Sequence, residues 1–552
     1  MALHRRRLIL IIGCAMFGLV VFACAPKVLA QPRPARSVNF SADVTGVKLA
    51  KGPDAARFGR RVAAILGASG PDKGSWGVLV TDAATGQILY ARNAGRYFAP
   101  ASNAKLFTTA FALATLGPDY RVKTTVVSDG ALEANGRLNG DLVLIGGGDA
   151  NLSNRKFPYD KNEEREGPPE KVLAELADAV AARGVKEITG DVIADDSLFQ
   201  HDQFPSGWTV DDTLWSYGAA VSAIVVNDNT FALTLRPGPR VGAPAIYDTG
   251  LAAGFYTVEN SIRTGARDSE ENLAVARDPG SRVIRVSGVM PLNAPPRRLT
   301  IAVDEPAEYA AHLLVRLLQA RDVKIDGRAR SRHAGDPQPG RGAPQTVLAE
   351  HTSVPLADDI RLTNKNSENL HAELLLLLAA HEKTGATGYE DALKAAADFF
   401  RAAGVAEGDV LLSDGSGLSR KDLVTPRAIV QMLRYASTQP WGQVYRSSLP
   451  VAGEDGTLSD RMKNTPAAGR IFAKTGTIGH VNSLSGYASS LRGEHLLFSI
   501  MGNNNSLSAH DANRVIDAIA VAMVEDFRPA PQAIQRKEKR KYERKKLRKV
   551  RK

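Results

Sequence analysis

The sequence predicts an α/β (α+β) fold in which one antiparallel sheet, flanked by helices, is split by a large β-rich insert. Three observations support this prediction. A helix pattern and a hairpin pattern stand near the start of the folded chain, strand-like runs and a helix stand near its end, and residues 121–350 carry short strand patterns separated by turn residues. We therefore expect both ends of the chain to close one sheet, from which the insert extends.

The composition is that of a folded protein whose ends differ from its body. The chain has 552 residues, 44% hydrophobic and 23% charged, which excludes wholesale disorder and a polytopic membrane protein. The net charge of +11 comes from the ends, because residues 536–552 hold twelve Lys or Arg against two Glu and residues 1–30 hold four more. We expect residues 528–552 to be a solvated, disordered tail, and we expect no nucleic-acid partner.

Residues 1–30 are typical of a bacterial export signal. Arginines at positions 5–7 precede an apolar stretch, and a small-residue cleavage site ends at Ala30. Two alternatives remain open. The apolar stretch approaches the length of a membrane span, so it could be an uncleaved anchor. The residues before Cys24 resemble a lipobox, which would make Cys24 a lipidated first residue. Each alternative predicts a periplasmic or otherwise extracytoplasmic protein, and cleavage after Ala30 is the favoured interpretation.

The body of the chain contains no thiol. Both cysteines, Cys14 and Cys24, lie within the export signal. This excludes disulfide scaffolds, thiolate metal sites and cysteine nucleophiles from the folded part. Residues 31–53 show no apolar period and are interpreted as a linker.

The first part of the body, residues 54–120, combines helices with a hairpin. Apolar residues recur at helical spacing before and after two short apolar runs, and a turn at Thr85-Gly86 separates those runs. Gly117-Pro118 ends the second helix pattern. The predicted elements are a helix over 54–66, strands over 76–80 and 87–90, and a helix over 102–116.

The predicted secondary structure changes twice in the later part of the chain. Residues 121–350 carry short strand runs and one helix pattern, over 169–183, and we interpret them as one or two inserted modules. Residues 351–527 are predicted to complete the first part. Their expected elements are helices over 370–382, 388–403 and 426–437, strands over 471–478, 483–491 and 495–502, and a helix over 511–526.

Three short motifs that serine–lysine acyl transfer requires each occur twice. The chemistry needs a Ser-x-x-Lys on a helix, a Ser-x-Asn from elsewhere and a Lys-Thr-Gly on a facing strand. The copies are Ser102–Lys105 and Ser153–Lys156, Ser367–Asn369 and Ser37–Asn39, and Lys474–Gly476 and Lys383–Gly385. Because each motif is too short to be trusted alone, context has to choose between the copies.

Ser102 and Lys105 are the favoured copy of the first motif. They open an apolar helix pattern, and the i, i+3 spacing puts both side chains on one face. The start of a helix also offers backbone N–H groups to a developing oxyanion. Ser153–Lys156 lies in a polar loop that cannot fix the geometry. Taken alone, Ser102 and Lys105 would be an ordinary serine at a helix start and a surface lysine.

Context also selects one copy of the other two motifs. Ser367 and Asn369 stand where a loop enters a helix, although both residue types are common helix caps. Ser37–Asn39 lies in the linker. Lys474 lies on a strand-like run, whereas Lys383 ends a helix, where lysine and glycine are routine. The chosen copies occur in the order and contexts that the chemistry requires.

The chain resembles penicillin-binding D-alanyl-D-alanine carboxypeptidases/endopeptidases of class C, serine peptidase family S13. The resemblance implies a penicillin-binding/β-lactamase-like transpeptidase domain with a large insert between the first two motifs. One departure is Ala150, where the family often has proline, and the basic tail is another. The similar segments are Pro100–Leu106, Gly140–Leu144, Gly190–Ser197, Asn364–Glu373, Asp414–Arg420, Gly453–Leu458 and Ala473–Thr477.

The resemblance also implies a mechanism. Ser102 would attack the carbonyl of a D-alanine in peptidoglycan stem peptides, with Lys105 as its base, and β-lactams would acylate the same serine. Lys105 must be neutral to act, so burial and a second cation, Lys474, would lower its pKa. The implied catalytic residues are Ser102, Lys105, Ser367 and Asn369, and the implied substrate-binding residues are Lys474, Thr475, Gly476 and Thr477. No metal or organic cofactor is expected.

Two rival functions remain at this stage. A β-lactamase-like hydrolase shares the motifs but must deacylate quickly, and a wall-binding protein with a vestigial site needs no chemistry. The basic tail suggests a further partner, an anionic membrane or wall polymer, because clustered cations are attracted to such surfaces.

Overall fold

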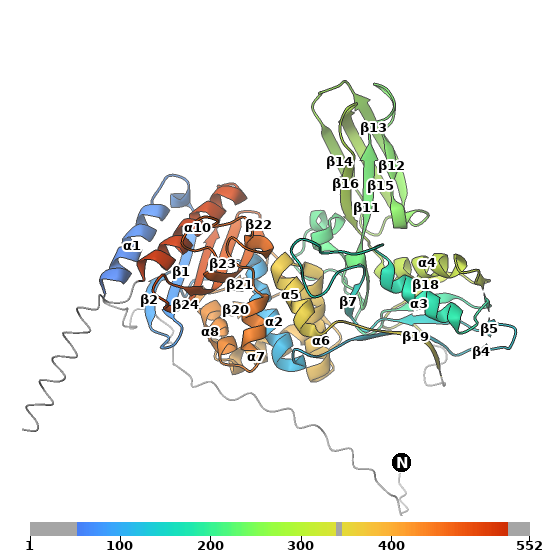
Figure 1. Cartoon of the computed structure of the whole chain (residues 1–552), viewed down its shortest axis with the longest axis horizontal. Coiled ribbons are helices and arrows are strands. Elements are labelled where there is room, and N and C mark those ends of the chain that lie inside the picture. The colour runs from blue at the N-terminus through green and yellow to red at the C-terminus, as the bar shows by residue number, and fades with distance from the viewer. Residues whose placement is uncertain (1–51, 338–344, 528–552) are drawn as a thin grey trace, which may run out of the picture. The chain divides into compact units, whose positions relative to one another are not determined.

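The computed structural model describes residues 52–337 and 345–527 (Figure 1). Within these residues, the central sheet has five antiparallel strands in the order β2-β1-β24-β23-β22. Its strands are β1 (Ser75–Asp82), β2 (Ile88–Arg92), β22 (Ile471–Ile478), β23 (Val481–Ser489) and β24 (His495–Asn503). The predicted sheet, built from both ends of the body, is confirmed. The predicted export signal, most of the linker and the basic tail lie outside the described residues.

Helices from both ends of the body cover one face of this sheet. α1 (Pro53–Leu66) packs against α10 (Ala509–Asp526), and α10 packs against β23 (Figure 1). Phe58 of α1 is fully buried and lies 5.3 Å from Phe527, measured between ring centroids. Arg57 adds an ion pair with Asp526 at 2.7 Å. The two ends of the body therefore hold each other in place.

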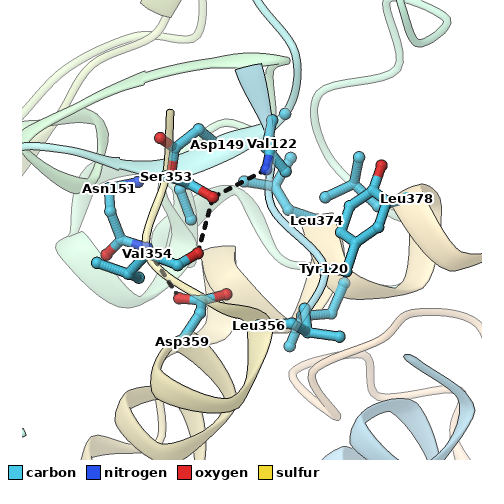
Figure 2. A pocket seen from close by; sticks show the side chains of 13 residues that line it. Tyr120, Val122, Asp149, Asn151, Ser353, Val354, Leu356, Asp359, Leu374 and Leu378 are labelled. Atoms are coloured by element: carbon cyan, nitrogen blue, oxygen red, sulfur yellow. Dashed lines mark hydrogen bonds between the residues drawn. The ribbon is translucent and has the colours of Figure 1, made fainter. Parts of the chain in front are cut away.

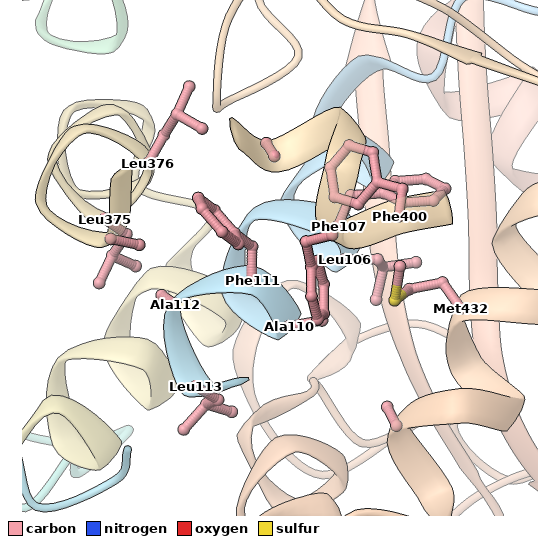
Figure 3. Packing of buried hydrophobic residues seen from close by; sticks show 14 of the residues in the cluster. Leu106, Phe107, Ala110, Phe111, Ala112, Leu113, Leu375, Leu376, Phe400 and Met432 are labelled. Atoms are coloured by element: carbon pink, nitrogen blue, oxygen red, sulfur yellow. The ribbon is translucent and has the colours of Figure 1, made fainter. Parts of the chain in front are cut away.

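A buried helix, α2 (Lys105–Leu116), lies at the centre of the helical layer on the other side. Every residue from Lys105 to Leu113 is buried, as expected for a helix that is apolar all round. Figure 3 shows Phe107 and Phe111 of this helix among residues of its neighbours; Phe107 lies 5.2 Å from Phe400. The packing partners are α5 (Leu356–Asn366), α6 (Asn369–Thr384), α7 (Tyr389–Ala402), α8 (Pro426–Ser437) and α9 (Gly442–Ser448).

The described part of the insert, residues 121–337 and 345–350, contains several small sheets and two α-helices. Its largest sheet has five strands in the order β18-β9-β6-β3-β19, and sheets of four, three and two strands accompany it. Its helices are α3 (Lys171–Ala182) and α4 (Pro306–Gln319). Its strands are β3 (Lys123–Ser128), β4 (Ala131–Leu132), β5 (Arg137–Asn139), β6 (Leu142–Ile145), β7 (Asp149–Leu152), β8 (Glu187–Ile188), β9 (Val192–Asp195), β10 (Ile224–Val226), β11 (Thr230–Arg236), β12 (Ile246–Asp248), β13 (Thr257–Gly265), β14 (Asn272–Ala276), β15 (Val283–Pro291), β16 (Arg297–Ala302), β17 (Lys324–Ile325), β18 (Ala329–Arg332) and β19 (Thr346–Thr352). A further pair, β20 (Val410–Leu411) and β21 (Leu423–Val424), follows α7.

Three helices were not predicted from the sequence. α4 begins at Pro306, a residue favoured in the first turn of a helix, but it lies in a segment dominated by strand patterns. α5 is largely polar, so its periodicity is weak, and α9 is only seven residues long. The prediction of a single helix in the insert was therefore wrong.

The two connections to the insert lie side by side. Ser353 Oγ accepts a hydrogen bond from the Val122 backbone N–H at 2.9 Å and donates one to the Val354 carbonyl at 2.8 Å, as Figure 2 shows. Asn151 adds a hydrogen bond to Asp359 at 3.0 Å. These groups line a cavity of about 20 Å³, which has room for about one water molecule. The segments that enter and leave the insert are thus joined by a hydrogen bond between Val122 and Ser353.

None of the helices within the described ranges combines the length and the hydrophobicity that a membrane span requires.

Candidate active site

Ser102 lies on a short turn immediately before the central helix. The sequence placed it on the helix itself, but a 3-10 turn (Ala101–Ala104) precedes α2. The expected i, i+3 proximity is nevertheless present, because Lys105 Nζ lies 2.9 Å from Ser102 Oγ. Ala101 has a φ of +46°, a conformation that is unfavourable for a side chain other than glycine. A strained turn therefore presents Ser102.

The amine of Lys105 is fully buried and has three oxygen neighbours. These are Ser102 Oγ at 2.9 Å, Asn369 Oδ1 at 2.6 Å and the Ser416 carbonyl at 2.9 Å. A neutral amine has two N–H donors and one lone pair. Asn369 and Ser416 offer only acceptors at these atoms, whereas the Ser102 hydroxyl can donate. The geometry therefore suits a neutral Lys105 that accepts the Ser102 proton.

Burial shifts the proton affinity of this amine. Loss of water lowers the pKa of Lys105 to about 8, although carboxylates near it, Asp414 first, act in the opposite direction. An amine with that pKa is partly neutral at neutral pH and can serve as a general base.

An acidic floor of three buried carboxyl groups, Glu373, Asp414 and Asp422, lies beside Lys105. Burial, and then the charge of Asp414, raises the pKa of Glu373 to about 8 and that of Asp422 well above its usual value. Glu373 accepts the backbone N–H groups of Gly415 and Ser416, both at 2.8 Å. It therefore fixes the loop whose Ser416 carbonyl contacts Lys105.

Sequence reasoning assigned no role to this acidic floor. Glu373 and Asp414 lie in segments that were noted for family resemblance, but only the fold shows that they converge. Asp414 accepts a hydrogen bond from Trp208 Nε1 of the insert at 2.9 Å. The available signal was the presence of acidic residues within otherwise apolar or glycine-rich surroundings.

Ser367 lies between two helices, and this corrects the sequence interpretation. It follows α5 as its C-terminal cap with φ +65° and ψ +38°, and α6 begins at Asn369. It therefore lies at the end of one helix, and the loop expected at the entry to the next helix is a short turn at Ser367 and Glu368. Asn369 uses its two polar atoms in different directions, with Oδ1 facing Lys105 and Nδ2 donating to the Tyr217 carbonyl of the insert at 2.7 Å.

An ion network from the insert holds this turn. Arg155 contacts Asp228 at 2.7 Å and Glu368, the residue between Ser367 and Asn369, at 2.8 Å. Burial alone would raise the pKa of Asp228, but Arg155 and His371 outweigh it and hold the pKa well below its usual value. Burial likewise opposes protonation of His371, yet the neighbouring carboxylates raise its pKa to about 10. Charged groups from both parts of the chain thus position the second motif.

The third motif approaches the first across the edge of the central sheet. Lys474 on β22 donates to Ser367 Oγ at 2.8 Å and to the Thr475 carbonyl at 3.0 Å. Asn103 Nδ2 donates to the Lys474 carbonyl at 3.0 Å. A Cβ on Gly476 would lie 2.7 Å from the Pro100 carbonyl, so only glycine allows β22 to come this close. Thr477, the last predicted binding residue, is exposed beyond this contact.

The electrostatics of Lys474 differ from the sequence interpretation. Its amine is fully buried, and burial followed by the charge of Lys105 lowers the pKa of Lys474 well below its usual value. The shift on Lys105 comes from burial, and a positive Lys474 is not among its main causes. The carboxyl groups of the acidic floor raise the pKa of Lys105, whereas both of the causes acting on Lys474, burial and the charge of Lys105, lower its pKa.

The rejected motif copies have other contacts. Ser153 Oγ accepts the Arg155 backbone N–H at 3.3 Å, and Lys156 pairs with Glu163. Lys383 lies 5.3 Å from the ring centroid of Phe111. Ser37–Asn39 falls outside the described ranges. The structure therefore brings together Ser102, Lys105, Ser367, Asn369 and the Lys474–Thr477 strand.

Comparison with known proteins identifies the family. The model of the D-Ala-D-Ala carboxypeptidase 3 (S13) family matches residues 60–525. The chain belongs to this family. A D-alanyl-D-alanine carboxypeptidase of an Actinomadura species is 37% identical over 460 residues, which cover 81% of each chain. A D-alanyl-D-alanine carboxypeptidase of Haemophilus influenzae is 27% identical and covers 78% of this chain and 85% of its own length.

A solved structure supports the fold. The crystal structure of penicillin-binding protein 4 from Haemophilus influenzae matches with a TM-score of 0.73 at 24% identity, over 84% of this chain and 98% of its own. The S13 match includes the insert, so a β-lactamase-like alternative is not favoured. The predicted family, fold class and enzyme class, a serine-type carboxypeptidase, are confirmed.

The two Lys-Thr-Gly copies provide a matched test. We expect Lys474→Met, which keeps most of the side-chain volume, to lower kcat/KM for a D-Ala-D-Ala peptide by about 10- to 100-fold, the cost of losing one charged contact if Lys474 binds the substrate as predicted. Lys383→Met should leave kcat/KM unchanged, since the contact of Lys383 with the Phe111 ring contributes only ~0.5–1 kcal/mol to stability. Equal kinetic loss in both variants would show that context selected the wrong copy.

Proposed function

We propose that this S13 enzyme hydrolyses the D-alanyl-D-alanine ends of peptidoglycan stem peptides through an acyl-enzyme on Ser102. The observation that carries the proposal is the pair of close contacts between buried lysines and serines: Lys105 Nζ lies 2.9 Å from Ser102 Oγ, and Lys474 Nζ lies 2.8 Å from Ser367 Oγ. Each serine thus has an amine within proton-transfer distance.

In the first step, neutral Lys105 accepts the Ser102 proton as Oγ attacks the carbonyl carbon. Asn369 and the Ser416 carbonyl hold the amine by its two N–H groups, so its lone pair stays directed at Ser102. The backbone N–H groups of Ser102 and Thr477 are proposed to bind the oxyanion, where losing one donor typically costs about 100- to 1,000-fold in rate.

In the second step, the C–N bond of the tetrahedral intermediate breaks, Ser367 passes its hydroxyl proton to the nitrogen of the leaving D-alanine, and charged Lys474 replaces that proton on Ser367. Its hydroxyl lies 2.8 Å from Lys474 Nζ. The substrate carboxylate, bound by Lys474, Thr475 and Thr477, favours the charged form of Lys474. That charge in turn opposes a positive charge on Lys105. Substrate binding is therefore proposed to promote release of the Lys105 proton. Water then hydrolyses the ester and restores Ser102.

β-Lactams are proposed to acylate the same serine. A solved structure of penicillin-binding protein 4 from Haemophilus influenzae contains a β-lactam. In this chain the strained amide would meet Ser102 Oγ, and its carboxylate would meet Lys474.

The domain organisation and location follow from this proposal. Residues 54–120 and 351–527 would form the peptidase domain, and residues 121–350 the insert. Peptidoglycan lies outside the cytoplasmic membrane, so we propose that residues 1–30 direct export and that residues 31–53 link them to the domain.

Penicillin labelling tests the nucleophile directly. Mass spectrometry after penicillin treatment should find one added penicillin on Ser102, and Ser102→Ala should remove both labelling and peptidase activity. Ser153→Ala, which alters the other Ser-x-x-Lys copy, should label normally. Labelling that persists in the Ser102→Ala variant would contradict the proposed mechanism.

The basic tail is proposed to bind an anionic surface. Twelve cations in residues 536–552 each contribute about 1 kcal/mol near an anionic membrane. We expect deletion of these residues to leave soluble-substrate kinetics intact and to weaken sedimentation with anionic vesicles. The difference should shrink as salt rises, because salt screens the attraction.

A tail of equal length with its Lys and Arg replaced by Gln serves as control and should behave like the deletion. Equal sedimentation of the deleted and full-length proteins at low salt would reject a surface-binding role.

A further inference from the structure

A second cluster of chemistry-bearing side chains lies in the insert, outside the active site. β9 and β18 are parallel neighbours, so their carboxyl ends meet at one edge of the sheet. Asp196 directly follows β9, His333 directly follows β18, and His201 lies five residues beyond Asp196. Glu305, the residue before α4, faces the same edge. Topology therefore gathers two imidazoles and two carboxylates from three distant segments.

The distances approach those of a metal site. Asp196, His201 and His333 each offer a ligand atom, and these atoms all lie within 4.8 Å of one another. Asp196 Oδ1 lies 2.7 Å from His333 Nδ1. Glu305 lies 4.0 Å from His201 Nε2 and 3.9 Å from His333 Nε2. Adjacent ligands of tetrahedral Zn²⁺ are about 3.3 Å apart. The Asp196–His333 contact would therefore have to lengthen, and the widest of the other separations would have to shorten by about 1.5 Å.

The surroundings also suit a cation. The imidazole rings of His201 and His333 are 3.9 Å apart between centroids and tilted by 39°, so the two side chains border the same space. Ser222 donates to the second oxygen of Asp196 at 2.7 Å, which orients the carboxylate toward His333. Hydrogen bonds of this kind commonly orient metal ligands. The side chain of Asp196 is 6% exposed and that of His201 34%, so the cluster is fixed on one side and open on the other.

We propose that Asp196, His201 and His333 bind one divalent transition-metal ion, for which Zn²⁺ is the natural candidate. Glu305 lies near the other ring nitrogen of His333, Nε2, and would support that imidazole from outside the coordination shell. Imidazole and carboxylate ligands in this number are typical of Zn²⁺. Two carboxylates also balance the charge of a divalent ion. The bound metal has a structural role, and the acyl-transfer reaction does not involve it.

The site would act through the loop that begins at Asp196. Gln200 donates its backbone N–H to the Thr387 carbonyl at 2.7 Å, and Trp208 donates to Asp414 at 2.9 Å. The loop thus leads from the proposed metal site to the acidic floor beside Lys105. A metal that fixes the start of this loop would strengthen the attachment of the insert to the peptidase part.

Equilibrium dialysis of the full chain against Zn²⁺, followed by elemental analysis, tests the proposal. We expect one Zn²⁺ per chain that is lost on adding a chelator, and a rise in Tm with Zn²⁺. His201→Ala should weaken binding by at least about 100-fold, the upper range for removing a group that merely supports a ligand. This half-open side chain can be removed without unfolding the protein, and normal penicillin labelling of the variant would verify that.

Two further measurements make the outcome decisive. His510→Ala removes an exposed histidine on α10 and should leave Zn²⁺ binding unchanged. Co²⁺ should give the intense visible absorption of a tetrahedral site in the wild-type protein and lose it in His201→Ala. A stoichiometry well below one, or Zn²⁺ binding unaffected by His201→Ala, would overturn the proposal and leave the cluster as an ordinary His–Asp pair.

Discussion

Lys105 is fully buried, and its amine contacts Ser102, Asn369 and the backbone carbonyl of Ser416. Removing an ammonium from water costs several kcal/mol, and this cost makes the neutral amine accessible near neutral pH. The rest of the site depends on this buried, neutral amine. Residues 105–113 of the central helix α2 are buried, which keeps this amine from water, and the strained turn before the helix places Ser102 within reach.

The acidic floor limits how far burial can lower the pKa of Lys105. Asp414 and Glu373 favour the charged form of Lys105, yet burial outweighs them and its pKa still falls to about 8. Lys474 has no such neighbours, and its pKa falls well below the usual value. Each lysine thus favours the neutral form of the other, and in the proposed mechanism a bound substrate carboxylate would favour the charged form of Lys474. The insert takes part as well, since Trp208 contacts Asp414 and Arg155 supports the Ser367 turn.

The sequence was sufficient to predict the parts of the site whose geometry depends on residues close together in the chain. Ser102 and Lys105 are one helical turn apart, so their proximity could be predicted, and the strands at both ends of the body showed clear patterns. Ser367 was harder, because α5 is polar and its end could not be distinguished from a loop. The acidic floor and the Arg155–Asp228 network could not be predicted, since their members are far apart in the chain and meet only in the fold. The lowered pKa of Lys474 could not be predicted either, because the sequence does not show that carboxyl groups surround Lys105 and that Lys474 is buried beside it.

The most direct test of this account is the pH dependence of Ser102 acylation. The second-order rate constant for penicillin, measured by stopped flow between about pH 6 and pH 10, reports the free enzyme's base. Because only neutral Lys105 accepts the proton, the rate should rise about tenfold per pH unit and level off near the pKa of about 8. A rate that still rises through pH 10 would show a lysine whose pKa is not lowered, and a rate that is flat throughout would show that Lys105 is not the base.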